Sequence, residues 1–198
     1  MSADAETIAF YDRDAAAYAD HVVMHGRRPS LEAFDAMLAR SADVLDFGCG
    51  GGQDAAWLRE RGHRVTAIDA SSGLAREARA RWDIDVRIAD FADLDALAAY
   101  DGVWSAAALH HAPAEQLADI VARVARSLKQ GGVFAATMKA GEDRRDGLGR
   151  FYCAMNADAA RALFDPAHWS EMTVRETEGA GYDDVAVPWL VISARRAS

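Results

Sequence analysis

The chain has 198 residues, of which 51% are hydrophobic, and its formal net charge is −9. This length and composition favour one compact domain over residues 1–198, with a core that needs no disulfides. The negative charge repels polyphosphate chains, which argues against nucleic acid as the substrate. The two cysteines, Cys49 and Cys153, stand far apart and match no disulfide framework or zinc motif, so we expect no metal.

The start of the chain has neither the basic segment nor the apolar run of a signal peptide. No stretch approaches the roughly 20 apolar residues that a membrane span needs. We therefore expect a cytoplasmic protein, monomeric or homodimeric, that acts away from membranes.

Residues 1–40 are predicted to form a helical cap, with Tyr11, Ala15 and Tyr18 on one helical face. From residue 41 to 140, short runs rich in β-branched residues alternate with helical stretches. Strands are expected at 43–47, 64–68, 86–89, 102–107 and 133–138, and helices at about 53–61, 71–82 and 113–128, the last stopped by Gly131. This alternation predicts an α/β fold with parallel strand pairing.

Residues 141–198 follow a different pattern. Loop 141–152 is rich in glycine, arginine and aspartate, and we expect it to cover a site. A helix near 158–164 and two strands at 173–177 and 189–194 should follow. With no room for a helix between them, these two strands predict a hairpin that adds an antiparallel strand to the sheet.

Ligands of an open α/β sheet bind beyond the carboxyl ends of its strands, where the strand order reverses. The segment DVLDFGCGGGQD, residues 43–54, carries a glycine loop from the first strand into a helix. Its glycines permit a tight turn and let a ligand approach bare backbone. The helix start offers unpaired N–H groups to an anionic group. A tight turn that binds no ligand is the alternative.

Two acidic residues follow the next strands. Asp69 lies about 20 residues past the glycines, the spacing at which a carboxylate meets a ribose diol. Asp90 ends the third strand, where it can accept an adenine amino hydrogen while Phe91 packs against the ring. Alternatively, both aspartates cap helices and Phe91 belongs to the core.

The fourth strand ends in small residues followed by His110 and His111. Small side chains leave room for a ligand, and either histidine can take a proton or orient a substrate. A purely structural histidine is an equally good interpretation for each. Zinc is disfavoured because no cysteine or further histidine lies near in sequence.

These motifs together resemble those of class I S-adenosylmethionine-dependent methyltransferases. LDFGCGGG is similar to their first motif, and LKQGGVF, residues 128–134, is similar to their fifth-strand signature, with Gln130 in place of the usual proline. AFYDRDAAAY and GRFY resemble a small bacterial branch that includes tellurite-resistance, type 11 and type 25 methyltransferase-domain proteins. The resemblance spans about residues 8–196. It implies a Rossmann-like, seven-stranded, mostly parallel sheet with helices on both faces and its last strand antiparallel.

The resemblance also implies S-adenosylmethionine as the cofactor and S-adenosylhomocysteine as its product. The implied cofactor contacts come from the glycine loop, the acidic strand ends and the helical cap: Asp46, Gly48, Cys49, Gly50, Asp69, Ala70, Asp90, Phe91, Ala106, Tyr11, Tyr18 and Arg28. Arg28 is the implied contact of the methionine carboxylate.

Methyl transfer from a sulfonium mainly requires alignment and exclusion of water, with a base needed only for a protonated acceptor. His110 or His111 is the predicted base, and Lys139, Arg150 and Tyr152 are predicted to grip an anionic small-molecule acceptor. Thiol-dependent metalloid chemistry is disfavoured by the scarcity of cysteine.

Two alternatives stay open. Gly50-x-Gly52-x-x-Ala55 also fits the dinucleotide fingerprint of NAD(P)-dependent oxidoreductases. The long helical cap and Asp90 do not fit that class, and no Tyr-x-x-x-Lys pair follows the fourth strand. A non-catalytic protein that binds S-adenosylmethionine is the second alternative, disfavoured by the lid-like loop.

Overall fold

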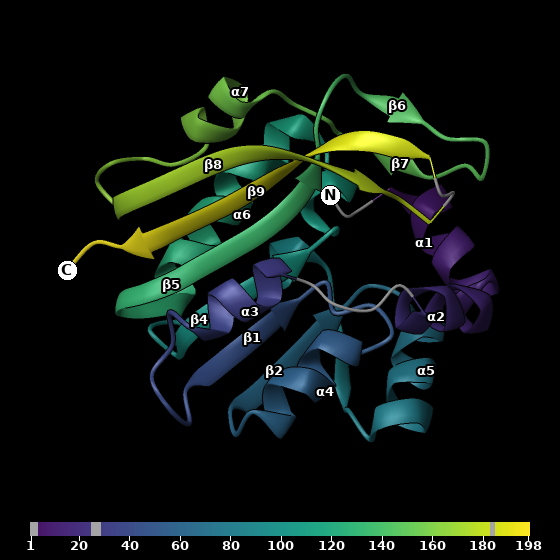
Figure 1. Cartoon of the computed structure of the whole chain (residues 1–198), viewed down its shortest axis with the longest axis horizontal. Coiled ribbons are helices and arrows are strands. Elements are labelled where there is room, and N and C mark those ends of the chain that lie inside the picture. The colour runs from purple at the N-terminus through teal and green to yellow at the C-terminus, as the bar shows by residue number, and fades with distance from the viewer. Residues whose placement is uncertain (1–3, 25–28, 183–184) are drawn as a thin grey trace.

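The computed structural model of the chain describes residues 4–24, 29–182 and 185–198 (Figure 1). Its N-terminal part is helical, as predicted, and consists of α1 (Ala5–Arg13), α2 (Ala15–Met24) and α3 (Pro29–Asp35). Asp4 caps α1, because its carboxylate accepts the backbone N–H of Thr7 at 3.0 Å. Helices α1 and α2 pack beside α5 (Ser72–Trp82), next to the carboxyl ends of the strands (Figure 1).

The central sheet has seven strands in the order β3-β2-β1-β4-β5-β9-β8. Its members are β1 (Asp43–Phe47), β2 (Arg64–Asp69), β3 (Val86–Ile88), β4 (Tyr100–Ala106), β5 (Leu128–Lys139), β8 (Trp169–Ala180) and β9 (Ala186–Arg196). Strands β1 to β5 pair in parallel, and β9 runs antiparallel to both β5 and β8. The predicted mostly parallel, seven-stranded sheet with an antiparallel last strand is confirmed.

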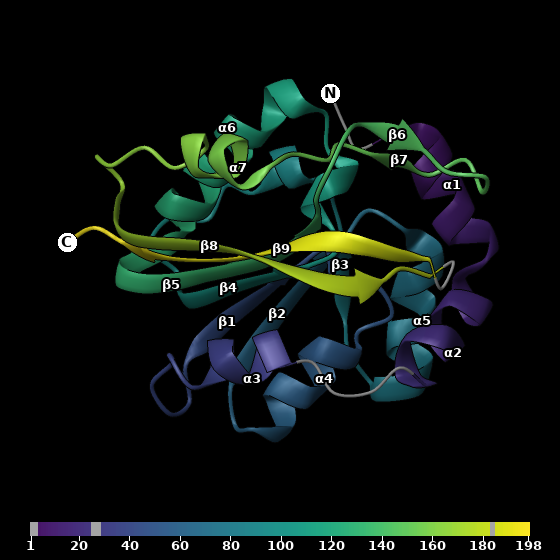
Figure 2. The same cartoon turned by 45° about the horizontal axis from the view of Figure 1, so that its top comes forward.

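Helices cover both faces of the sheet (Figure 2). One face carries α6 (Ala114–Ser127) and α7 (Ala157–Ala162), and the other carries α3, α4 (Gln53–Glu60) and α5. The apolar stripe of α6, from Leu117 to Val124, is buried against Leu45, Val103 and Phe134 of the strands. Each such buried side chain contributes about 1.5–3 kcal/mol relative to exposure. The core thus holds the strand ends in fixed positions.

Three boundaries differ from the sequence-based expectations. Helix α6 ends at Ser127 and β5 begins at Leu128, so Gly131 lies inside a strand, at an irregular pairing with β4. Strands β8 and β9 are about twice as long as predicted, because the outer half of β8 is exposed and carries polar residues that hide the strand pattern. Segment 141–152 is not only a loop, since β6 (Arg144–Arg145) pairs with β7 (Phe151–Tyr152).

Two short 3-10 turns, η1 (Phe91–Asp93) and η2 (Leu109–His111), follow β3 and β4. They place the residues after both strands at the edge where the strand order reverses between β1 and β4. In the described parts of the chain, none of the helices combines the length and apolar character required for a bilayer crossing.

Candidate functional site

A cavity of about 410 Å³ opens at the carboxyl ends of β1, β2 and β4. Its floor is made by segments that follow these strands, and its opposite side is made by α1, α2 and the hairpin of β8 and β9. The strand order reverses at this edge, which is where ligands of such sheets bind. Of the residues predicted from the sequence to bind cofactor, those lining the cavity are Tyr11, Tyr18, Asp46, Gly48, Cys49, Gly50, Asp69, Ala70, Phe91 and Ala106.

The glycine loop is bound to the neighbouring strand through its backbone. The N–H groups of Gly48 and Cys49 both donate to the carbonyl of Ile68, at 2.8 and 3.0 Å. Gly48 has a φ of +79°, and a Cβ there would lie 2.4 Å from the Cβ of Ala108. Only glycine meets both demands. The loop therefore leaves a bare backbone surface on the cavity, which is what a close-fitting ligand needs.

Asp69 is held in place by the loops on either side of it. One carboxylate oxygen accepts the backbone N–H of Gly50 at 2.8 Å, and the other accepts that of Ser71 at 2.8 Å. Burial raises the pKa of Asp69, and the two amide donors offset this only in part. Each oxygen keeps a lone pair for a further donor, so the carboxylate can accept from a diol.

Asp90 and Phe91 occupy different positions relative to the cavity. Phe91 lines it, beside Ala89, and packs edge-on against Phe47 with ring centroids 5.0 Å apart. Asp90 lies between these two lining residues but is not itself part of the lining. Its backbone N–H donates to the carboxylate of Asp93 at 2.9 Å, as in the capping alternative. The structure thus brings Asp69, but not the carboxylate of Asp90, to the cavity.

The end of β4 holds a strained residue. Ala107 lines the cavity with a φ of +52°, which is uncommon for a residue other than glycine. Its N–H is held by Thr137 of β5, at 2.9 Å from the carbonyl and 3.0 Å from the hydroxyl. Such strain gathers at functional sites, where surrounding structure maintains it. The small residues Ala106 to Ala108 leave the room that the sequence predicted.

His111 lines the cavity with a defined tautomer. Its Nδ1 lies 2.6 Å from the carbonyl of Phe151, which accepts only from an N–H. Nε2 is therefore the acceptor, and it lies 3.0 Å from the hydroxyl of Tyr11. Burial is the main cause that lowers the pKa of His111, to about 4, so the ring is neutral near pH 7. A neutral imidazole and a tyrosine hydroxyl thus form a hydrogen-bonded pair beside the cavity.

His110 is in a different environment. It is 1% exposed, does not line the cavity, and its Nδ1 accepts the backbone N–H of Lys139 at 3.1 Å. Burial lowers its pKa well below the ordinary value. Of the two predicted bases, the structure brings His111 to the cavity and gives His110 a structural position that joins η2 to β5.

Lys139, Arg150 and Tyr152 also lie outside the cavity lining. All three are at most 3% exposed. The Lys139 ammonium stacks over the Tyr152 ring at 3.9 Å, and the Arg150 guanidinium pairs with Asp146 at 2.8 Å. These positions do not support the prediction that the three side chains grip an anionic acceptor, because the charges of Lys139 and Arg150 are engaged by other residues of the protein. Arg28 falls outside the described residues.

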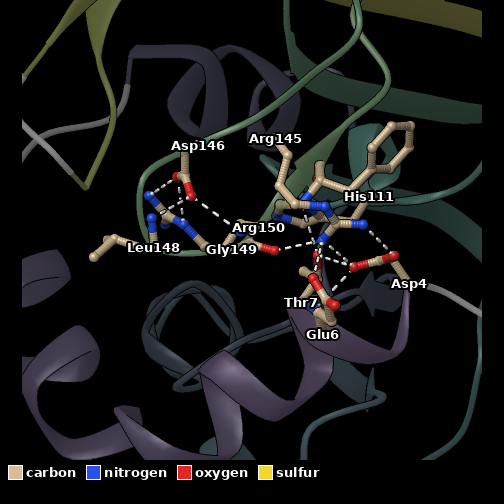
Figure 3. Close-up of polar contacts among 10 residues, drawn as sticks. Asp4, Glu6, Thr7, His111, Arg145, Asp146, Leu148, Gly149 and Arg150 are labelled. Carbon is tan, nitrogen blue, oxygen red and sulfur yellow. Dashed lines mark hydrogen bonds and ion pairs between the residues drawn. The ribbon is translucent and has the colours of Figure 1, made fainter.

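The β6–β7 hairpin is fastened to α1 (Figure 3). Arg145 makes two hydrogen bonds to Asp4, both at 2.9 Å, and an ion pair with Glu6 at 3.0 Å. The backbone N–H of Phe151 donates to the Thr7 hydroxyl at 2.9 Å. Because the carbonyl of Phe151 holds His111, this docking also orients the imidazole. No residue of segment 141–152 is among those that line the cavity, so the expectation that it covers a site stays a prediction.

Several cavity residues were missed by sequence reasoning. Tyr182, at the tip of the β8–β9 hairpin, lies 5.2 Å from the Tyr18 ring and 4.9 Å from the His21 ring, measured between centroids. Tyr11 and Tyr18 are 4.9 Å apart. We call Tyr11, Tyr18, His21 and Tyr182 the aromatic wall, and all four line the cavity together with Trp189. Tyr11 and Tyr18 were predicted from the helical pattern, but no local sequence signal links Tyr182 to them, because only the fold brings it there.

Asp12 is a second missed residue. Its carboxylate accepts from the N–H of Gly73 at 2.7 Å and from the hydroxyls of Ser71 and Ser72 at 2.8 and 3.3 Å. Burial raises the pKa of Asp12, but the hydrogen bonds from the Gly73 N–H and the serine hydroxyls lower it by more. The pKa of Asp12 is therefore below its ordinary value. These bonds fasten α1 to the start of α5. The spacing of 59 residues or more explains why sequence reasoning did not find them.

The charge of the cavity separates the two cofactor classes. Among the described residues that line it, four are acidic (Asp46, Asp54, Asp69 and Glu178) and none is lysine or arginine. A dinucleotide brings a pyrophosphate anion, which these carboxylates repel. S-adenosylmethionine brings a sulfonium cation and an ammonium group, which they attract. The bare backbone at Gly48 and the diol-binding carboxylate of Asp69 also fit an adenosyl ligand.

Comparison with known proteins agrees with this. Residues 44–132 match the model of a methyltransferase domain family. A structure of the 1,6-didemethyltoxoflavin N1-methyltransferase of Burkholderia thailandensis, with bound 1,6-didemethyltoxoflavin and S-adenosylhomocysteine, is 26% identical, with a TM-score of 0.73, and the match covers 100% of this chain and 92% of that one. The chain thus carries a methyltransferase domain over residues 44–132, and these similarities support a class I S-adenosylmethionine-dependent methyltransferase.

Two further proteins are similar to this chain. A malonyl-[acyl-carrier protein] O-methyltransferase of Enterobacter lignolyticus is 36% identical over 140 residues, which is 68% of this chain and 53% of the relative. The chain thus spans about half the length of this curated relative. A TehB-like methyltransferase of Corynebacterium glutamicum shares the fold, with a TM-score of 0.67 at 18% identity over 94% of this chain and 98% of that one.

Proposed function

We propose that this methyltransferase transfers a methyl group to a nitrogen or oxygen of a small-molecule acceptor, with His111 as the general base. The observation that carries the proposal is the pair of Tyr11 and His111, joined at 3.0 Å on the cavity surface, with Nδ1 of His111 bound to a carbonyl. S-adenosylmethionine bound there would supply an electrophilic methyl group, and its sulfur would keep the electron pair of the broken bond.

The protein handles the acceptor proton. Nε2 of His111 already accepts from the Tyr11 hydroxyl, so Tyr11 Oη can take the acceptor proton as its own proton passes to Nε2. The Phe151 carbonyl stabilises the imidazolium that results, because Nδ1–H keeps its acceptor. Tyr11 and His111 are positioned by α1, η2 and β7, which together exclude water from this side.

The strand-end loops would hold the cofactor. The backbone beside Gly48 and Gly50 would receive the methionine part, Asp69 the ribose hydroxyls, and Phe91 the adenine face. Asp90 lies next to Phe91 but outside the lining, so it would contribute less than Asp69.

The names of the relatives support a small acceptor of this kind. The Burkholderia thailandensis protein is named for N1-methylation of 1,6-didemethyltoxoflavin, and the match covers almost the whole of both chains. The Enterobacter lignolyticus relative is named for O-methylation of a malonyl group on a carrier protein. The first is the better guide, because the second is matched over about half of its length only.

The experiment is transfer of radiolabelled methyl from S-adenosylmethionine to a panel of phenols and N–H heterocycles, followed by variants tested on the best acceptor. We expect His111→Ala to lower kcat by about 10²–10⁴-fold, and Tyr11→Phe to give a loss of the same order. The affinity for S-adenosylhomocysteine should stay within about threefold. A His111→Ala variant with wild-type kcat would disprove the assignment of the base, and His110→Gln serves as the structural control.

A further inference from the structure

We infer that the acceptor is an uncharged, planar aromatic molecule with an acidic N–H or O–H, bound against the aromatic wall. This inference rests on the proposed function, since it names the class of molecule that the same site methylates. It is carried by the shape of the wall, by the charges around it and by the environment of the base.

The wall is a continuous set of rings on one side of the cavity. Tyr11, Tyr18, Tyr182 and His21 follow one another at centroid distances of 4.9, 5.2 and 4.9 Å. All four are half-buried, so part of each ring is left for a ligand. Flat rings at edge-on and offset angles favour a flat partner that continues the same packing. An aliphatic acceptor gains less from such a surface.

The charges of the site disfavour an anionic acceptor. Glu178 lines the cavity beside the wall, and among the described lining residues no lysine or arginine balances it. Arg150, a cation that contacts the rings of the wall, is paired with Asp146 at 2.8 Å and is 1% exposed. A carboxylate or phosphate would lose its hydration without gaining a partner.

The buried arginine also disfavours a cationic acceptor. The guanidinium of Arg150 lies over the rings of Tyr182 and Tyr11, 5.3 and 6.0 Å from their centroids. The guanidinium already uses the attraction of these two rings for positive charge, so less of that attraction is left for a second cation. The wall is thus not a cage for an ammonium group, and an uncharged ring remains the fitting ligand.

The weak basicity of His111 narrows the class of acceptor further. Burial keeps the pKa of His111 at about 4, which makes it a weak base. Such a base takes a proton poorly from a group whose pKa approaches that of water, about 16. It does so more readily from a phenol-like group with a pKa of about 10 or below. Aromatic hydroxyls and ring N–H groups conjugated to carbonyls belong to this second class.

Calorimetric binding to the full chain saturated with S-adenosylhomocysteine tests the inference without turnover. The probes are quinolin-4-ol, kynurenic acid, N-methylquinolinium and decahydronaphthalen-1-ol, which change the charge or planarity of one bicyclic frame. We expect quinolin-4-ol to bind at least about tenfold more tightly than each of the other three. Equal or tighter binding of the anion, the cation or the saturated alcohol, or no binding of quinolin-4-ol, would overturn the inference.

Variants of Tyr182 tie the preference to the wall. Tyr182→Leu should weaken quinolin-4-ol about tenfold by removing a ring contact, whereas Tyr182→Phe should keep the affinity. Val185→Ala, a change at an exposed residue outside the lining, is the matched control and should change nothing. If Tyr182→Leu binds quinolin-4-ol like the wild type, the wall is not the acceptor surface. Loss of S-adenosylhomocysteine binding by the wild type would instead refute the proposed function itself.

Discussion

The two ends of the cavity are built in different ways. The cofactor end consists of short segments directly after β1, β2, β3 and β4, all within the residues 44–132 that match the family model. The acceptor end draws on α1, α2, the β6–β7 hairpin and the β8–β9 hairpin, which lie outside that match. The part of the cavity made of backbone and strand ends is thus specified by local sequence. The part made of side-chain surfaces is specified by tertiary packing.

The largest effect should come from the backbone of the cofactor end. Gly48→Ala would bring a Cβ to 2.4 Å from Ala108 at a positive φ. We expect calorimetry to detect a loss of S-adenosylhomocysteine affinity of at least about 100-fold, or about 2.7 kcal/mol. Gly131→Ala is the matched control, because it has a φ of +71° but no atom within 4 Å of an added Cβ. Equal effects of the two changes would show that strain alone, and not the cavity, is responsible.

The next largest effect on binding distinguishes Asp69 from Asp90, both of which were predicted from the sequence to contact the cofactor. Asp69→Asn removes a charged acceptor that lines the cavity and should weaken the cofactor product about 10- to 100-fold. Asp90→Asn, at a position outside the lining, should weaken it by less than about threefold. The reverse order would mean that ligand binding moves Asp90 into the cavity and that its position outside the lining is not the bound one.

The buried His111 of the acceptor end should make the free energy of unfolding depend on pH. His111 has a folded pKa of about 4 against an ordinary 6.5, so protonation favours the unfolded chain. Its contribution, of order 3 kcal/mol, is fully present above pH 6.5 and is lost as the pH falls toward 4. Between pH 7.5 and pH 5, the free energy of unfolding measured in urea should fall less for His111→Phe than for the wild type. Identical losses would contradict a buried, neutral His111.

The smallest effect concerns the hairpin contacts. Arg145 is exposed, so its ion pairs with Asp4 and Glu6 contribute little to stability. Arg145→Gln should nevertheless lower kcat/KM about threefold to fivefold, because the hairpin positions Phe151 and hence His111. Arg175→Gln, at an exposed residue of β8, is the control. An unchanged kcat/KM in Arg145→Gln would mean that the hairpin docks without these pairs.

The contrast between the ends also explains what the sequence could predict. The glycine loop and Asp69 were found because turn geometry and strand ends leave a local signature, as with the positive φ of Gly48. The alternating pattern likewise predicted the strand sequence from β1 to β5. Tyr182 and Asp12 left no signature, since their partners lie far away in the chain. The sequence also could not predict which of His110 and His111 is the base. The two are neighbours in the chain, and only the backbone path after β4 decides which ring faces the cavity.

Calorimetric titration of the wild-type chain at pH 7 with S-adenosylhomocysteine, and separately with NAD⁺, tests the central claim most directly. The carboxylate-lined cavity with its bare glycine backbone predicts one S-adenosylhomocysteine site and no measurable heat with NAD⁺. Binding of NAD⁺ as tight as that of S-adenosylhomocysteine, or no binding of S-adenosylhomocysteine, would contradict the account of this cavity.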